Sequence, residues 1–223
     1  MRAKIAEIFK SVQGEGIYIG QEQIFVRFYG CNLNCKFCDT KLYNYTEYES
    51  LDLYRYIKSN YRRFHSISLT GGEPLIQKDF LKHFLPLLKK SKFKVYLETN
   101  ATLPSALKDI IDFIDIIALD FKLPSSTGLK ELYNEHEQFL KIALEKDAFI
   151  KAVICYTTEL ADFKKAIQII SRNKKETPFL LQPNTFELSK ALMDKIKDYK
   201  SIALEFLPDV RIVPQMHKLV GIK

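Results

Sequence analysis

The sequence has 223 residues, the length of one large domain or two small ones. Apolar residues make up 47% of it, and 16 Phe and 12 Tyr exclude an intrinsically disordered chain. The net charge of +7 is spread along the chain, so we interpret it as a solvated surface and expect no direct nucleic-acid partner. No apolar run reaches the roughly 20 residues of a membrane span. The start, MRAKIAEIFK, lacks the apolar block of a signal peptide, so we expect a cytoplasmic protein.

Strands and helices are predicted to alternate along the chain. Strands are expected at residues 23–29, 65–69, 93–99, 114–121, 148–156, 178–182 and 201–206. Helices are expected at 51–61, 79–90, 104–113, 129–145, 159–172 and 186–199, the second kinked or broken at Pro86. This α/β alternation implies a parallel sheet with helices outside it, and six or so units favour a partial (β/α)6-like barrel over a complete one. With no repeat or linker, residues 1–223 are predicted to form a single domain.

Polar motifs follow several of the predicted strands directly. They are Cys31, Gly71-Gly72-Glu73, Thr99-Asn100, Lys122 and Gln182. Because the carboxyl ends of parallel strands meet at one edge of a sheet, these motifs are expected to form one active site there.

Three cysteines lie within eight residues, in the pattern Cys31-x3-Cys35-x2-Cys38. Three thiolates on one loop can ligate an iron–sulfur cluster and leave one iron open for a cofactor or substrate. A zinc site completed by Cys155 is an alternative, but that residue follows an apolar run and is more typical of a buried small side chain.

The cysteine loop resembles the signature of the radical S-adenosylmethionine (SAM) enzymes, with Phe37 at the aromatic position before the last cysteine. Gly71-Gly72-Glu73-Pro74 resembles a SAM-contacting motif of that superfamily. The resemblance implies a radical SAM barrel, a [4Fe–4S] cluster on Cys31, Cys35 and Cys38, and SAM on the fourth iron. It also implies that the reduced cluster cleaves SAM to a 5′-deoxyadenosyl radical.

Further segments resemble the 7-carboxy-7-deazaguanine synthase family over essentially the whole chain. These are Ser11-Val-Gln-Gly-Glu-Gly16, Cys38-Asp39-Thr40 and Gln215-Met-His-Lys218. The resemblance implies a ring-contracting lyase that converts 6-carboxy-5,6,7,8-tetrahydropterin to 7-carboxy-7-deazaguanine and ammonia, in queuosine or deazapurine biosynthesis. Two alternatives stay open: a glycyl-radical activating enzyme, which shares the cysteine loop, and a zinc-bound RNA-binding module.

The same resemblance assigns residues to each ligand. SAM is expected to contact Phe37, Gly71, Gly72, Glu73, Thr99, Asn100, Lys122 and Gln182. The pterin substrate is expected to contact Gln13, Glu15, Gly16, Arg27, His217 and Lys223, and Thr40 is expected to bind Mg²⁺. Arg27 also stands out by itself, because a charge in an apolar strand is costly unless it is paired. The expected partners are a second copy of the chain, as a homodimer, and a flavodoxin or ferredoxin as electron donor.

Overall fold

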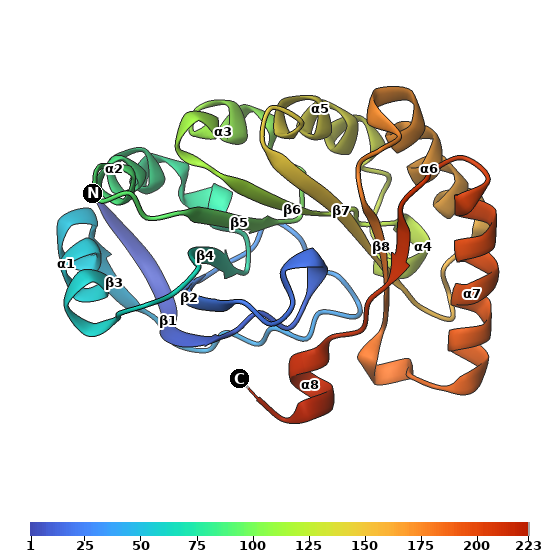
Figure 1. The fold of residues 1–223 in the computed structure, drawn as a ribbon, viewed down its shortest axis with the longest axis horizontal. Helices are drawn as coiled ribbons and strands as arrows, with labels where there is room; N and C mark the ends of the chain where they lie inside the picture. The colour runs from blue at the N-terminus through green and yellow to red at the C-terminus, as the bar shows by residue number, and fades with distance from the viewer. Residues whose placement is uncertain (223) are drawn as a thin grey trace.

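The computed structural model describes residues 1–222, and a single nine-stranded sheet runs through it (Figure 1). The strand order is β3-β1-β2-β4-β5-β6-β7-β8-β9. The strands are β1 (Arg2–Val12), β2 (Glu22–Phe28), β3 (Thr46–Glu49), β4 (Ser66–Gly71), β5 (Val95–Thr99), β6 (Ile116–Asp120), β7 (Asp147–Ile154), β8 (Phe179–Pro183) and β9 (Val210–Ile212). All pairs from β2 to β9 are parallel, whereas β1 is antiparallel to both β2 and β3. This open, mostly parallel sheet is a partial barrel of the expected class.

Helices follow the parallel strands and pack along the outer face of the sheet (Figure 1). They are α1 (Ser50–Asn60), α2 (Lys78–Lys90), α3 (Pro104–Lys108), α4 (Pro124–Thr127), α5 (Tyr133–Ala143), α6 (Leu160–Lys174) and α7 (Lys190–Leu204). The short helix α8 (Met216–Val220) lies instead on the opposite side, below the sheet in Figure 1. Among the helices of residues 1–222, none is both long and apolar enough to cross a membrane.

Successive side chains of the central strands point to opposite faces of the sheet, and each face contributes to a separate hydrophobic core. The larger core fills the space between sheet and helices, and it takes Leu97, Leu119 and Ile150 from the outward side of β5, β6 and β7. A smaller core on the inner face contains Tyr96, Ile116, Ala118, Phe149 and Leu180. Because side chains alternate with a period of two, the next inward positions are Glu98, Asp120 and Lys151. The inner face therefore changes from apolar to charged toward the carboxyl ends of the strands.

Several predicted elements need correction. The predicted strand at 201–206 is wrong, because α7 continues to Leu204 and the last strand is β9 at Val210–Ile212. The buried residues Leu192, Ile196, Tyr199 and Ala203 recur every three or four positions, which extends one helical face past residue 199.

Three further differences concern boundaries. Strands β1 and β3 were not predicted, because their short apolar alternation is interrupted by charged side chains. The helix predicted at 104–113 is α3 followed by a 3-10 turn at Ile111–Phe113. Pro86 does not break α2, which runs through it.

Candidate active site

One cavity of about 890 Å³ opens at the carboxyl ends of the strands. Fifteen of the predicted site residues line it: Gln13, Glu15, Arg27, Cys31, Cys35, Phe37, Cys38, Thr40, Gly71, Gly72, Thr99, Asn100, Lys122, Gln182 and His217. Gly16 and Glu73 do not line the cavity, and Lys223 lies outside the described residues. The convergence expected from the strand-end motifs is therefore present.

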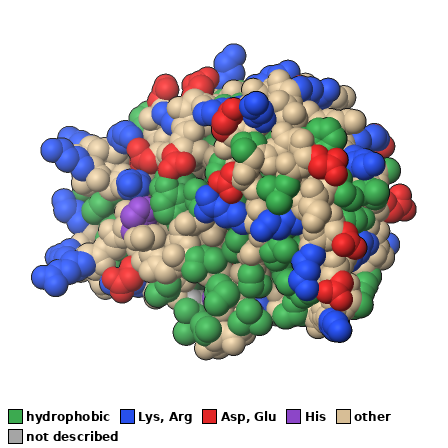
Figure 2. All heavy atoms as spheres, turned by 45° about the vertical axis from the view of Figure 1, so that its right-hand side comes forward, with side chains coloured by type: hydrophobic (Ala, Val, Ile, Leu, Met, Phe, Trp, Pro, Cys, Tyr) green, Lys and Arg blue, Asp and Glu red, His purple; other side chains and the backbone are tan. Residues whose placement is uncertain are grey.

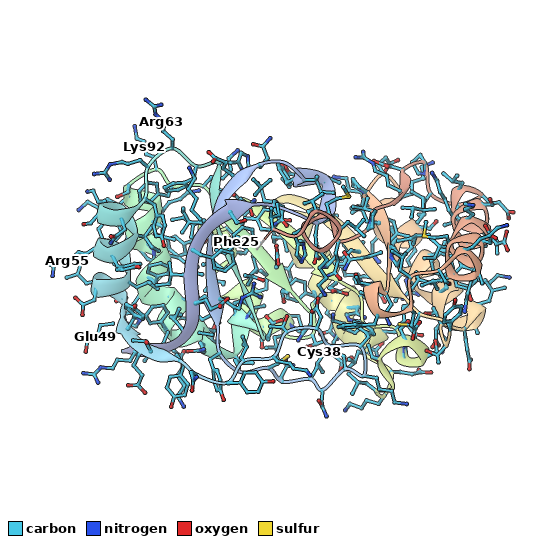
Figure 3. All side chains as sticks on the ribbon, turned by 90° about the horizontal axis from the view of Figure 1, so that it is seen from below. Phe25, Cys38, Glu49, Arg55, Arg63 and Lys92 are labelled. Carbon is cyan, nitrogen blue, oxygen red and sulfur yellow. The ribbon has the colours of Figure 1, made fainter. Side chains whose placement is uncertain are left out.

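The three cysteines lie on the loop between β2 and β3 and line the cavity, and Cys38 is labelled in Figure 3. The Leu33 amide donates to Cys31 Sγ at 3.4 Å, and Asn100 Nδ2 lies 3.8 Å from the same sulfur. Burial raises the pKa of Cys31, and it raises the pKa of Cys35 to about 11. These thiols must therefore lose protons when they bind a metal.

The donor set fits an iron–sulfur cluster better than a structural zinc ion. Within residues 1–222, no three His, Cys, Asp or Glu side chains are already gathered around one metal position, the cysteines of the loop included. Three thiols half open to a cavity can still be drawn together, since they share one short loop. Cys155 is buried at the end of β7, where Asn184 Nδ2 lies 3.6 Å from its sulfur. It occupies the small buried position expected for it.

The Gly71-Gly72 turn holds the cysteine loop against β4. The backbone amide of Gly72 donates to Phe28 O at 3.0 Å, and the backbone amide of Glu73 donates to Gly30 O at 2.8 Å. A Cβ atom on Gly72 would lie 1.8 Å from Gly30 O. A glycine is needed at position 72 because the loop carrying Cys31 passes so close.

Glu73 is fully buried beneath this turn and acts on the cavity through other residues. Its carboxylate accepts from the amides of Leu75 (3.1 Å) and Asn100 (2.7 Å) and from Thr99 Oγ1 (2.9 Å). Burial raises its pKa to about 7, although these donors act in the opposite direction. Glu73 thus fixes the ends of β4 and β5 with its side chain, and the SAM contact predicted for it involves backbone groups of the Gly71-Gly72-Glu73 motif.

Gly16 has a similar structural role on the substrate side. It has a φ of +74°, and a Cβ atom there would lie 2.5 Å from the ring of Phe149. The glycine therefore lets the 3-10 turn at Gly16–Tyr18 pack onto the inner core, and it positions the neighbouring Glu15.

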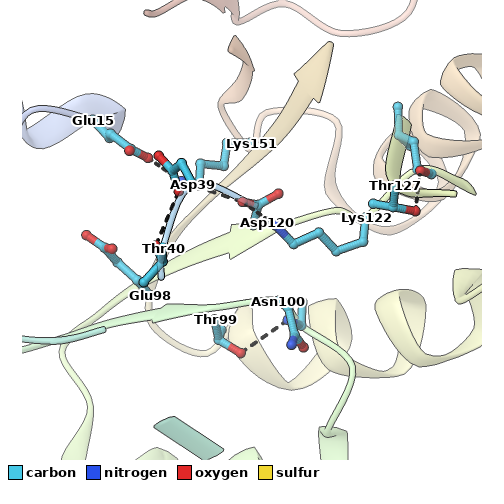
Figure 4. Close-up of polar contacts among 12 residues, drawn as sticks. Glu15, Asp39, Thr40, Glu98, Thr99, Asn100, Asp120, Lys122, Thr127 and Lys151 are labelled. Carbon is cyan, nitrogen blue, oxygen red and sulfur yellow. Dashed lines mark hydrogen bonds and ion pairs between the residues drawn. The ribbon is translucent and has the colours of Figure 1, made fainter. Parts of the chain in front are cut away.

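Charged side chains form a chain of contacts across the cavity floor (Figure 4). Lys122 Nζ lies 2.8 Å from Asp120 Oδ2, and Lys151 Nζ lies 3.6 Å from the same oxygen. Lys151 is also ion-paired with Glu15. Lys122 lies 5.3 Å from the ring centroid of Phe37, so the chain reaches the cysteine loop.

The C-terminal segment lines the cavity and contacts both Glu15 and Asp39. Gln215 Nε2 donates to Glu15 Oε1 at 2.7 Å and to Asp39 Oδ2 at 3.0 Å, and Lys218 is ion-paired with Asp39. These contacts lower the pKa of Asp39 to about 2, against its burial. His217 packs so closely on Gly14 that a Cβ atom there would lie 2.4 Å from its Nδ1.

The remaining predicted residues also have defined partners. Arg27 lies 3.1 Å from Glu7 Oε2, so the charge in this strand is paired. Gln13 Nε2 donates to Glu98 Oε1 at 2.8 Å and to Gln23 Oε1 at 3.0 Å. Thr40 Oγ1 donates to Asp39 Oδ1 at 3.2 Å.

Glu98, Asp120 and Lys151 line the cavity but were not identified from the sequence. A signal for them exists, since each is a charged residue on the inward side of an otherwise apolar strand.

Comparison with known proteins identifies the family of the chain. Residues 25–158 match the radical SAM superfamily. The chain is 37% identical to a 7-carboxy-7-deazaguanine synthase of Geobacter sulfurreducens, over 98% of this chain and 97% of that protein. It is 34% identical to the synthase of Clostridium acetobutylicum, over 99% and 96%. In fold it resembles the crystal structure of QueE from Escherichia coli, with a TM-score of 0.66, 22% identity and coverage of 97% and 95%. The chain thus belongs to the radical SAM superfamily and, within it, to the 7-carboxy-7-deazaguanine synthase family.

Proposed function

We propose that this protein is the lyase that converts 6-carboxy-5,6,7,8-tetrahydropterin to 7-carboxy-7-deazaguanine and ammonia, for queuosine or another deazapurine. The observation that carries the proposal is one cavity that joins the three-cysteine loop to Gln13, Glu15, Arg27 and His217. Similarity to named synthases over nearly the whole chain supports the same reaction. It favours this lyase over a glycyl-radical activating enzyme.

We call the part of the cavity lined by Cys31, Cys35 and Cys38 the cofactor half, and the part lined by Gln13, Glu15, Arg27 and His217 the substrate half. Cys31, Cys35 and Cys38 would hold a [4Fe–4S] cluster, which with bound SAM supplies a 5′-deoxyadenosyl radical that removes a hydrogen atom from the pterin. Phe37, Asn100, Lys122 and Gln182 line the same half and would hold SAM. Lys122 keeps its positive charge, because Asp120 beside it holds its pKa above the usual value despite burial. It can therefore bind the carboxylate of an amino acid.

The substrate half offers groups that match a carboxylated pterin. Glu15 can accept hydrogen bonds from the amino edge of the ring, and Gln13 presents an amide beside it. Arg27 and His217 supply donors for the carboxylate on the other side. A site that binds both ends of the substrate would hold one C–H bond toward the cofactor half.

We also propose that Thr40 binds Mg²⁺. Its hydroxyl and the Asp39 carboxylate are hard oxygen donors next to the last cysteine of the loop, and both line the cavity. Mg²⁺ needs few protein ligands when substrate and water complete its octahedron.

The proposed homodimer is supported by exposed apolar side chains beside the cavity. Phe186 is 70% exposed, and Leu219, Val220 and Ile222 are also exposed. Lys218 lies over the Phe186 ring at 5.1 Å, so α8 and the segment after β8 form one surface. Hydrophobic side chains gather on the lower part of the face in Figure 2. Covering such a surface is the usual reason for self-association.

An anaerobic assay tests the reaction. The reconstituted protein is incubated with SAM, reductant, Mg²⁺ and 6-carboxytetrahydropterin, and 7-carboxy-7-deazaguanine is measured by mass. We expect more product than SAM consumed, because the resemblance implies that SAM is regenerated. A Cys35→Ala variant is the matched control and should form neither product nor 5′-deoxyadenosine. Cleavage of SAM without the deazaguanine product would overturn the substrate assignment and keep the radical SAM assignment.

A further inference from the structure

Lys151 is a largely buried cation beside Glu15 in the cavity, and the proposed reaction has so far given it no role. Its side chain is 12% exposed and lines the cavity from the inward side of β7. It stands in a row with Glu15, Asp120 and Lys122, which are 13–16% exposed, and the four charges alternate in sign. Because buried charges are stable only when paired, removing one member affects its neighbours.

Both carboxylate oxygens of Glu15 already have a donor. Oε2 is paired with Lys151, and Oε1 accepts from Gln215 Nε2 at 2.7 Å. Each oxygen of a carboxylate can accept a second hydrogen bond. The two donors therefore fix the plane of the carboxylate and leave one acceptor position on each oxygen, which suits a ligand edge with two parallel N–H groups.

Lys151 also determines the charge of this group. Burial alone would raise the pKa of Glu15, and the nearby Asp39 acts in the same direction. Lys151 and Gln215 outweigh both, so the pKa of Glu15 lies below its usual value. Glu15, Asp120 and Glu98 in turn hold the pKa of Lys151 above its usual value, against its burial.

From this geometry we propose that Lys151 is a positioning residue, which orients the Glu15 carboxylate toward the N–H donors of the pterin ring and does not itself bind the substrate. This inference rests on the proposed function, because it assigns a role within that substrate site. The cations of the cavity then have separate roles. Lys122 faces the cofactor half, Arg27 binds the substrate carboxylate, and Lys151 holds the acid that recognises the ring.

The test is a double-mutant cycle on substrate binding. The Kd of 6-carboxytetrahydropterin is measured by calorimetry on the SAM-loaded, unreduced holoenzyme, for the wild type, Lys151→Met, Glu15→Gln and the double variant. We expect Lys151→Met to raise Kd about tenfold, since one partner of a buried pair is lost. KM should rise in parallel with little change in kcat. In the Glu15→Gln background the same change should raise Kd less than about twofold, because the two residues act as one unit.

Further variants separate positioning from folding. Lys151→Arg keeps the charge and should bring Kd back to within about threefold of wild type, and Lys151→Gln is a second neutral variant if Lys151→Met does not fold. Lys165→Met is the matched control, because Lys165 forms an exposed pair with Glu131 at 3.0 Å, away from the cavity.

Two outcomes would overturn the inference. An unchanged Kd in folded Lys151→Met would make the pair purely structural, and an equal loss in both backgrounds would mean that Lys151 binds the substrate directly. A wild type that neither binds nor converts the pterin would instead remove the proposed function, and this inference with it.

Discussion

At the scale of single residues, His136 shows how one buried side chain joins two walls of the site. Its Nε2 lies 3.3 Å from both Asn100 O and Lys122 N, and its ring stacks on Phe121. Its Nδ1 is buried without a hydrogen-bond partner among the described residues. Burial lowers its pKa to about 4, so this imidazole is neutral in the folded protein at neutral pH.

This histidine should make the protein less stable in acid. Its pKa is about 4 when folded and 6.5 when unfolded, so between pH 6.5 and about pH 4 the unfolded chain takes up the proton and the folded chain mostly does not. The free energy of unfolding should fall by about 2 kcal/mol between pH 7 and pH 5 from this residue alone. Urea unfolding at both pH values measures it. His136→Phe should lose that part of the pH dependence, and the exposed His83→Phe controls for removal of an imidazole. The same pH dependence in His136→Phe and wild type would contradict the assignment.

At the scale of elements, the turn after β4 and the cysteine loop act as one unit. The backbone amides of Gly72 and Glu73 donate to the carbonyl oxygens of Phe28 and Gly30. These two hydrogen bonds hold the turn against the start of the cysteine loop. The sequence resemblance attributes these glycines to SAM, whereas the geometry also gives them a packing role.

Gly72→Ala should therefore damage the cluster site more than the fold. The new Cβ atom would lie 1.8 Å from Gly30 O, and the conflict is relieved only when the loop carrying Cys31 moves away. We expect bound iron and SAM cleavage to fall by about tenfold, because small displacements of reacting groups cost that much. Iron analysis and 5′-deoxyadenosine formation measure both quantities. Gly20→Asn is the control, since nothing lies within 4 Å of a Cβ atom there. Full iron content in Gly72→Ala would show that the loop tolerates the shift.

At the scale of the whole molecule, the cysteine loop lies away from the cations Arg63 and Lys92. Figure 3 shows Cys38 at one edge of the molecule and Arg63 and Lys92 at the other. We therefore propose that an electron donor approaches the loop on the side where the exposed Lys36 and Lys41 flank Cys38. A flavodoxin or ferredoxin with acidic side chains around its redox centre would complement these two cations.

Charge reversal tests this approach to the loop. Lys36→Glu together with Lys41→Glu should slow reduction by the acidic donor about tenfold at low salt, because steering of the encounter is lost. Reduction by dithionite, a small chemical reductant, should change far less. Lys92→Glu removes the same kind of charge on the opposite side and should leave both rates unchanged. Equal slowing by Lys92→Glu would mean that net charge, and not the docking surface, sets the rate. Stopped-flow absorbance of the cluster gives all of these rates.

The sequence allowed the parallel strands β2 and β4 to β8 to be predicted, because each is a largely buried apolar run and a polar motif follows each of them except β7. Most of the site residues that it predicted line the cavity, since strand ends converge in this architecture. It failed at β1 and β3, because charged side chains interrupt the apolar alternation of β1 and because β3 has only four residues. The packing roles of Glu73 and Gly16 could not be predicted either, because a motif shows neither which way the Glu73 side chain points nor that the Phe149 ring lies against Gly16.

The contact between Gln215 and Glu15 has a consequence for biosynthesis, since the two residues are 200 positions apart. During translation the cysteine loop and the parallel strands emerge long before α8, and chains tend to fold from the N-terminus onward. The substrate half can close only after the last helix has been made. Iron–sulfur assembly therefore has a period during synthesis when the loop is formed and its C-terminal cover is still absent. A cluster delivered in that period would be inserted before the C-terminal segment, which covers the substrate half, has been synthesised.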